Sequence, residues 1–336
     1  MEPIKTDILI IGAGPVGLFT VFEAGLLKLK CHLMDVLPQA GGQLTEIYPK
    51  KPIYDIPGLP IILASDLVSN LKKQIEPFKP TFTLGERADI IEHLSDGRFR
   101  ITGHAGTVIE AKVIAIAGGL GCFEPRKPPI PDIEKFEGKG VDYFVKEPAH
   151  YSGKKVVIAG GGDSALDWTI ELAEQGSHVT LIHRRSSFRG ALDSVDKVMK
   201  LTEKGQVHLI TDANVVDITG NERLHEVIVE VPEGKRTIDT DYFLPLFGLT
   251  PKLGPIADWG LNLDKNNIVV DPYDCSTNVK GIYAIGDINS YKGKLKLILC
   301  GFHEATMMCQ SAFQHIYPDQ KLSFKYTTVT GIEGFQ

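Results

Sequence analysis

The chain has 336 residues, of which 43% are hydrophobic and 23% are charged, and its mean hydropathy is −0.01. These values exclude a disulfide-stapled miniprotein, a disordered chain and a membrane-embedded protein, and the length predicts about two domains. With 36 Lys and Arg against 42 Asp and Glu, the net charge is −6. No global positive field exists to hold a nucleic-acid backbone, so we expect no nucleic-acid partner.

The N-terminal segment and the cysteines indicate a reduced, cytoplasmic protein. Residues 1–7 include no basic region ahead of the short apolar run at 8–11, so a secretory signal does not fit, and no apolar stretch reaches the roughly 18 residues of a membrane span. The five cysteines include no C-x-x-C pair and no metal-ligand spacing. We therefore expect a cytoplasmic protein with no membrane segment and no bound metal.

The first predicted elements are a strand at 6–11, a glycine-rich turn, a helix at 18–27 and a second strand at 30–35 that ends in Asp35. This order is typical of a dinucleotide-binding βαβ unit, where glycines admit the pyrophosphate to the positive end of the helix. A proline suits the first helical turn because its missing N–H loses no partner there. Asp35 is placed to accept hydrogen bonds from a ribose. We predict that the turn binds the phosphates through Gly12, Gly14, Pro15 and Gly17.

Two proline-containing breaks interrupt the pattern. A strand at 111–117 ends in two glycines and is followed by P-R-K-P-P-I-P at 125–131, and L-P-L-F-G-L-T-P occupies 244–251. Such segments cannot continue a sheet and suit interdomain connectors. We predict three segments, 1–119, 120–246 and 247–336, with the middle one inserted into the first domain.

A second strand–turn–helix–strand pattern occupies residues 154–182, and the residues after its last strand are His183, Arg184 and Arg185 instead of an acid. Two guanidiniums at the ribose position favour a 2′-phosphate, which a carboxylate would repel. We therefore predict a preference for NADP(H) over NAD(H), with a solvated loop as the alternative for the arginines and adenine contact or loop packing as the role of His183. The predicted site consists of Gly160, Gly162, Asp163, Ser164, Arg184, Arg185 and Arg189.

Near the end of the chain, a short strand closes on Gly286 and Asp287, and residues 302–316 have helical character. Together with G-G-Q-L at 41–44 and D-I-P-G at 55–58, the two glycine fingerprints resemble the two-dinucleotide-binding-domain flavoproteins, in their thioredoxin-reductase-like branch, over essentially the whole chain. Taken singly, the short motifs could be turns or strand-ending caps.

That resemblance implies an α/β fold of two Rossmann-like domains, the NADP domain being inserted into the FAD domain. It places FAD at the first glycine turn and NADPH at the second. By the same resemblance, Asp35 binds the adenosine ribose, Gln43 lies near the flavin and Asp287 holds the ribityl chain.

One departure from thioredoxin reductase bears on function. Where that enzyme carries a Cys-x-x-Cys, residues 141–148 read V-D-Y-F-V-K-E-P. Without a dithiol, electrons cannot leave the flavin through the protein's own thiols. With K-G-K-L-K at 292–296, G-F-H-E-A at 301–305 and a C-terminal extension from about residue 318, the chain resembles the thioredoxin-reductase-type ferredoxin/flavodoxin–NADP⁺ reductases.

This second resemblance implies a homodimeric enzyme that transfers electrons between NADPH and ferredoxin or flavodoxin by hydride transfer to FAD. It also implies that Tyr48 and Tyr326 stack on opposite flavin faces and that Thr328 contacts FAD, although either tyrosine could instead be core or surface filler. An acidic carrier could be steered by a group of lysines, for which a solvated surface is the alternative: Lys50, Lys51, Lys292, Lys294 and Lys296.

Two other functions fit the same cofactors. One is an NADPH-dependent flavin oxidase or a quinone or small-molecule reductase. The other is a non-enzymatic, NADP-responsive redox sensor.

Overall fold

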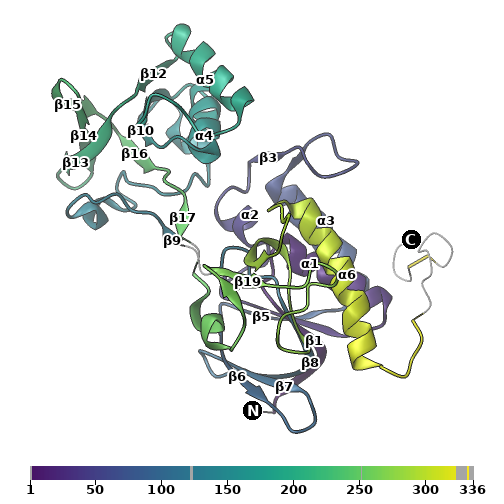
Figure 1. Ribbon diagram of the computed structural model, residues 1–336. Helices are drawn as coiled ribbons and strands as arrows, with labels where there is room; N and C mark the ends of the chain where they lie inside the picture. The colour runs from purple at the N-terminus through teal and green to yellow at the C-terminus, as the bar shows by residue number, and fades with distance from the viewer. Residues whose placement is uncertain (1, 122–123, 251, 323–330, 333–336) are drawn as a thin grey trace. The chain divides into compact units, whose positions relative to one another are not determined.

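The computed structural model describes residues 2–121, 124–250, 252–322 and 331–332. By its internal contacts the chain divides into two compact units, Met1–Cys122 with Pro251–Gln336 (unit 1) and Phe123–Thr250 (unit 2) (Figure 1). Unit 2 is thus an insertion into unit 1.

The main sheet of unit 1 has seven strands in the order β5-β2-β1-β8-β7-β6, with β20 also paired to β8. The pairs among β5, β2, β1, β8 and β20 are parallel, whereas β8–β7 and β7–β6 are antiparallel. Residues 8–10 of β1 and 113–116 of β8 are fully buried, as expected for central strands that are covered on both faces. The bounds are β1 (Ile4–Ile11), β2 (Cys31–Asp35), β5 (Thr81–Leu84), β6 (Ala88–His93), β7 (Phe99–Gly103), β8 (Val108–Ile116) and β20 (Ile282–Ala284).

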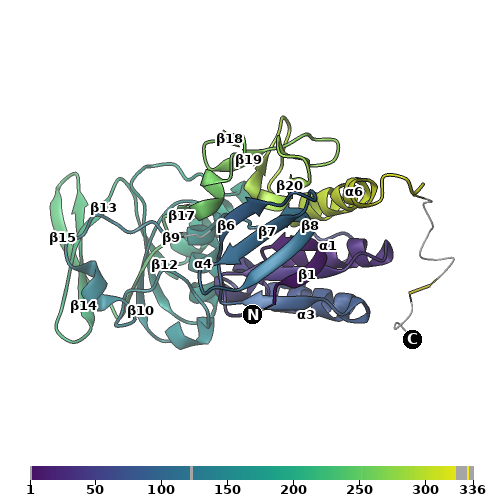
Figure 2. The same cartoon turned by 90° about the horizontal axis from the view of Figure 1, so that it is seen from below.

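Three helices pack on this sheet: α1 (Pro15–Leu26), α3 (Ala64–Ile75) and α6 (Ile298–Ile316). Helix α1 contacts both of the others and lies between them (Figure 2). It begins at Pro15, three residues before the predicted start, because proline at the first helical position is already in helical geometry. Helix α6 begins at Ile298, four residues before its predicted start.

The smaller elements of unit 1 complete the loops around the sheet. Strand β3 pairs antiparallel with β4, and β18, β19 and β21 form a small three-stranded sheet. None of the helices in the described ranges combines the length and the apolar sequence that crossing a bilayer requires. The bounds are α2 (Gln43–Glu46), β3 (Pro52–Ile53), β4 (Ile62–Leu63), β18 (Leu263–Asp264), β19 (Asn267–Val269), β21 (Asn289–Ser290), and the 3₁₀ turns η1 (Glu76–Phe78), η4 (Gly254–Asp258) and η5 (Gly286–Ile288).

Unit 2 is built on a four-stranded parallel sheet in the order β12-β11-β10-β16. A three-stranded antiparallel sheet, β13-β14-β15, adjoins it and was not predicted from the sequence. The parallel strand pairs at the centre of both main sheets confirm the predicted α/β class. The bounds are β9 (Glu124–Pro125), β10 (Lys155–Ala159), α4 (Asp163–Glu174), β11 (His178–Ile182), α5 (Leu192–Glu203), β12 (Val207–Ile210), β13 (Asn214–Gly220), β14 (Leu224–Val231), β15 (Gly234–Asp239), β16 (Tyr242–Pro245), β17 (Leu249–Thr250), η2 (Ile133–Phe136) and η3 (Pro148–Tyr151).

Candidate functional site

The glycine turn of unit 1 connects β1 to α1 and leaves one position open. Gly12 has φ +110°, and a Cβ on Gly12 or Gly17 would collide with a backbone carbonyl oxygen, so these two glycines are required by the fold itself. Among the residues that the structure describes, a Cβ on Gly14 would meet only the Cα of Gly42, at 3.9 Å. Gly14 is therefore the position where a ligand can approach the backbone closely.

The N-terminus of α1 has the properties of an anion site. Gly14 is its N-cap, Pro15 follows, and the first turn has neither a side-chain cap nor an acidic residue. The backbone N–H groups of a first helical turn lack intrahelical partners, and the helix dipole favours negative charge there. The open cradle at Gly14 and this uncapped helix end together fit a dinucleotide pyrophosphate.

Asp35 lies at the end of β2 against the same turn. Its Oδ2 accepts a hydrogen bond of 2.6 Å from the backbone N–H of Ala13, and its Oδ1 accepts one of 2.9 Å from that of Leu37. Burial raises the pKa of the Asp35 carboxyl, while these backbone hydrogen bonds lower it. The ribose contact stays a prediction, and the structure shows that the carboxylate holds the glycine turn through the Ala13 N–H.

The other residues predicted to bind FAD lie in the same unit. Gln43 begins α2, and its Nε2 comes within 3.4 Å of where a Cβ on Gly119 would lie. Burial, with a contribution from the charge of Asp287, raises the pKa of Tyr48 to about 12, so these two side chains are electrostatic neighbours. Asp287 lies on η5, directly after β20, and burial raises its pKa.

Tyr326 and Thr328 lie outside the described residues, so their roles stay predictions. Lys294 was predicted to help steer a carrier from the surface, and this prediction is wrong: its side chain is only 6% exposed and forms an ion pair with Glu304. A buried carboxylate on α6 draws the ammonium inward. Lys292 and Lys296 are exposed, and Lys296 Nζ donates to Asn267 Oδ1.

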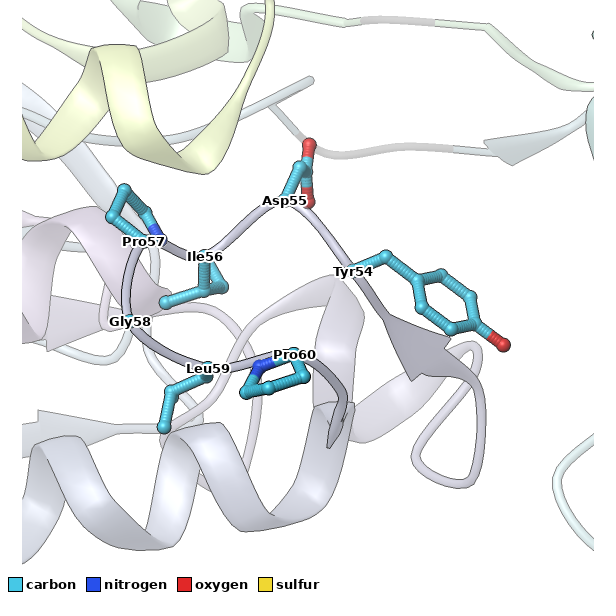
Figure 3. A pocket seen from close by; sticks show the side chains of 7 residues that line it. All are labelled: Tyr54, Asp55, Ile56, Pro57, Gly58, Leu59 and Pro60. Carbon is cyan, nitrogen blue, oxygen red and sulfur yellow. The ribbon is translucent and has the colours of Figure 1, made fainter.

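The D-I-P-G motif forms a turn in which Ile56 is buried, and residues 54–60 line a pocket there (Figure 3). The Leu59 N–H donates to the Ile56 carbonyl at 3.1 Å, and Gly58 has φ +80°. The ring of Tyr54 is 68% exposed and points away from the turn. The motif therefore has the backbone geometry of a turn.

The glycine turn of unit 2 resembles that of unit 1, because one glycine is crowded and another is open. A Cβ on Gly160 would crowd Ala165. Gly162 is the N-cap of α4, and no atom of the described part of the chain lies within 4 Å of where its Cβ would be. Ser164, on the first turn of α4, is exposed. Asp163 Oδ1 accepts a hydrogen bond of 2.7 Å from the backbone N–H of Ala191. Asp163 therefore ties the turn to the end of the arginine-bearing loop.

His183 packs the loop that carries the arginines. Its ring stacks on Phe188 with centroids 4.9 Å apart, and its Nε2 lies 3.0 Å from the Ser187 carbonyl oxygen. The backbone N–H of Arg189 donates to the Gly161 carbonyl at 2.9 Å, so the loop folds back on the glycine turn. All three arginines, Arg184, Arg185 and Arg189, are exposed.

A family model described as pyridine nucleotide-disulphide oxidoreductase matches residues 6–314. The chain belongs to this family. Ferredoxin–NADP reductase 1 of Christiangramia forsetii is 64% identical over 336 residues, covering 99% of this chain and 95% of that protein. The ferredoxin–NADP reductase of Flavobacterium johnsoniae is 63% identical over 333 residues, with the same coverage.

Solved structures show the fold. The thioredoxin reductase of Lactococcus lactis has a TM-score of 0.79 at 23% identity, covering 93% of this chain and 99% of its own. That of T. acidophilum has a TM-score of 0.79 at 24% identity, covering 92% and 98%. The predicted fold of two Rossmann-like domains and the predicted family membership are confirmed. The relatives' names agree with the predicted reductase and not with the oxidase, quinone reductase or sensor alternatives.

Proposed function

We propose that this chain is a FAD-dependent ferredoxin–NADP reductase that transfers electrons between NADP(H) and ferredoxin or flavodoxin. The observation that carries the proposal is that each unit has a glycine turn with one open position, Gly14 or Gly162, at an uncapped helix N-terminus. The names of relatives that are 63–65% identical over nearly the whole chain support the same activity.

The FAD would be held by unit 1. The turn residues Gly12, Gly14, Pro15 and Gly17 would receive its pyrophosphate, and Asp35 would accept hydrogen bonds from its adenosine ribose. Gln43, Tyr48 and Asp287 would surround the flavin end. When bound, FAD supplies the chemistry that couples a two-electron donor to one-electron carriers, while the protein binds, orients and excludes water.

The NADP(H) would be held by unit 2. Gly160, Gly162 and Ser164 would receive the pyrophosphate at the start of α4. Arg184, Arg185 and Arg189 would bind the 2′-phosphate, because exposed guanidiniums can form bidentate, charge-assisted hydrogen bonds with it. Asp163 would hold the arginine-bearing loop in place, since its Oδ1 accepts a hydrogen bond from the backbone N–H of Ala191 at the end of that loop.

Three of the five cysteines support electron transfer that does not pass through thiols. Cys31, Cys275 and Cys309 are buried free thiols, and burial raises the pKa of each. Because the thiolate is the reactive form, such cysteines are poor redox relays. The electrons would pass to the carrier directly.

We also infer a cytoplasmic homodimer. Exposed apolar side chains around β3 and β4 support a second copy as a partner, since Tyr54 is 68% and Ile61 57% exposed in unit 1. An equilibrium sedimentation measurement that gives only monomer would contradict this part of the proposal.

The function is tested with the purified protein. Flavin released by denaturation should elute as FAD on chromatography, because FMN lacks the ribose that Asp35 is placed to bind. NADPH should reduce ferredoxin and flavodoxin, compared at matched concentrations, faster than NADH does, and thioredoxin should not be reduced. FMN alone in the protein, or no reduction of either carrier, would overturn the proposal.

A further inference from the structure

Helix α6 carries a buried carboxylate that binds the turn following β20. Glu304 is 3% exposed. Its Oε2 accepts hydrogen bonds from the backbone N–H of Gly286 at 2.7 Å and from the Asn289 Nδ2 at 2.9 Å. These donors flank Asp287, so one oxygen of Glu304 fixes both ends of the turn that carries the predicted flavin contact.

The second oxygen of the same carboxylate is also fully used. Glu304 Oε1 accepts a hydrogen bond of 2.7 Å from the Tyr291 hydroxyl and another from the Lys294 ammonium. A carboxylate has about four acceptor positions, and here four donors occupy them. Lys294 also lies over the Tyr291 ring, 5.6 Å from its centroid. All four donors come from the single segment 286–294.

Close packing brings the carboxylate to this turn. Gly301 lies one helical turn before Glu304 on α6, and a Cβ there would strike the side chain of Val16 and come within 3.4 Å of the Gly286 Cα. Val16 belongs to the first turn of α1, at the open cradle. The hydrogen bonds of Glu304 are therefore in contact with both parts of the proposed unit 1 site, which are the turn of Asp287 and the N-terminal end of α1.

Stability alone does not account for an ion pair at this place. Removing two charges from water is costly, and well-packed apolar residues of the same size often stabilise a fold as well or better than a buried pair does. The Asn289 amide adds a further cost, because its Oδ1 is buried without a hydrogen-bond partner in the described part of the chain. What the charged pair supplies is a fixed orientation for the hydrogen-bond donors of segment 286–294, which all point to the Glu304 carboxylate.

We propose that Glu304 and Lys294 are positioning residues for FAD. Glu304 holds the 286–289 turn in the conformation that presents Asp287 to the dinucleotide. Lys294 neutralises the charge of Glu304 and, with Tyr291, donates to its Oε1. This inference rests on the proposed FAD site of unit 1.

The test compares FAD affinity with stability in the full-length protein. Glu304→Gln keeps the size of the side chain, removes its charge and leaves one acceptor oxygen where there were two. The dissociation constant of FAD from the apoprotein, titrated by flavin fluorescence, should rise at least about tenfold, as expected when charge-assisted hydrogen bonds are lost. Lys294→Met should also raise the FAD dissociation constant.

Glu110→Gln is the matched control. Glu110 is also a buried carboxylate of unit 1, 5% exposed and bonded by Arg98 and Arg100, and its donors lie away from the 286–294 segment. Its replacement should lower the melting temperature of the apoprotein and leave the FAD dissociation constant unchanged.

A double-variant comparison separates positioning from packing. If Glu304 acts through Asp287, adding Glu304→Gln to Asp287→Asn should change FAD affinity far less than Glu304→Gln changes it in the parent protein. Additive losses, or a Glu304→Gln protein that melts earlier but binds FAD normally, would overturn the inference.

Two further outcomes are distinguishable. If Glu304→Gln does not fold, Tyr291→Phe, which removes one hydrogen bond and keeps the ring, should weaken FAD binding by a smaller factor, and unchanged binding there would count against the inference. A parent apoprotein that binds no FAD would instead overturn the proposed function.

Discussion

The carboxylate of Asp35 accepts a 2.6 Å hydrogen bond from the backbone N–H of Ala13, which joins the end of β2 to the glycine turn at the end of β1. The acid that the sequence assigns to a ribose is thus also part of the cradle. If Asp35 binds the ribose as predicted, the same carboxylate serves both binding and local structure.

Asp35→Asn should weaken FAD binding. Asparagine has one carbonyl oxygen, so the N–H of Ala13 or that of Leu37 would face an amide NH₂ group. Losing hydrogen bonds to a charged group costs roughly 1.5–3 kcal/mol, or about a 10- to 150-fold rise in the dissociation constant. The dissociation constant is measured by fluorescence titration of the apoprotein with FAD. Asp96→Asn is the control, because exposed Asp96 also accepts a backbone hydrogen bond, from Arg98; equal losses in both variants would contradict the prediction.

Arg184→Ala combined with Arg185→Ala should reduce use of NADPH far more than use of NADH. Each lost charge-assisted hydrogen bond to a 2′-phosphate is worth roughly 1.5–3 kcal/mol, so the NADPH/NADH ratio of kcat/KM should fall by at least about tenfold. Arg236→Ala, at another exposed arginine of unit 2, should leave the ratio unchanged. An unchanged ratio in the double variant would show that these arginines do not recognise the phosphate.

Replacement of all five cysteines by Ser or Ala should leave NADPH-dependent reduction of a one-electron acceptor largely intact, when rates are normalised to bound flavin. The reason is that the buried thiols are held protonated and residues 141–148 contain no cysteine. Some loss of stability is expected at Cys309, which is fully buried. If alkylation of the native protein stopped electron transfer to the acceptor without unfolding it, a thiol step would be required.

His32 should make the protein less stable as the pH falls. Burial lowers the pKa of His32 to about 4, and its ring nitrogens bond the hydroxyls of Thr81 and Thr83. Because the folded-state pKa lies below the unfolded value of about 6.5, the unfolded chain binds the proton first, and stability is lost between those two values. His32→Gln should flatten the dependence of unfolding free energy on pH by up to about 1.4 kcal/mol per pH unit.

Urea unfolding at several pH values between 5 and 7 measures this slope for the parent and the variant. His178→Gln is the control, because His178 is an exposed histidine on β11. The same slope in parent and His32→Gln proteins would show that the His32 proton does not contribute.

The sequence alone determined the two dinucleotide units. Glycine turns, short apolar strands and the residue after the second strand are local signals, because each depends on backbone freedom or side-chain chemistry within about 30 residues. The same local logic located Asp35 and the three arginines. It missed the antiparallel sheet of residues 214–239 and the first turns of α1 and α6.

Only the tertiary structure decided how buried polar groups pair. Lys294 reads as a surface charge in a lysine-rich segment, yet packing at Gly301 brings Glu304 to it, and a buried carboxylate requires donors from wherever the fold supplies them. His32 likewise finds its partners about fifty residues away, on β5. Such pairings depend on the meeting of distant segments, which local patterns do not specify, whereas the glycine turns are specified by their own residues.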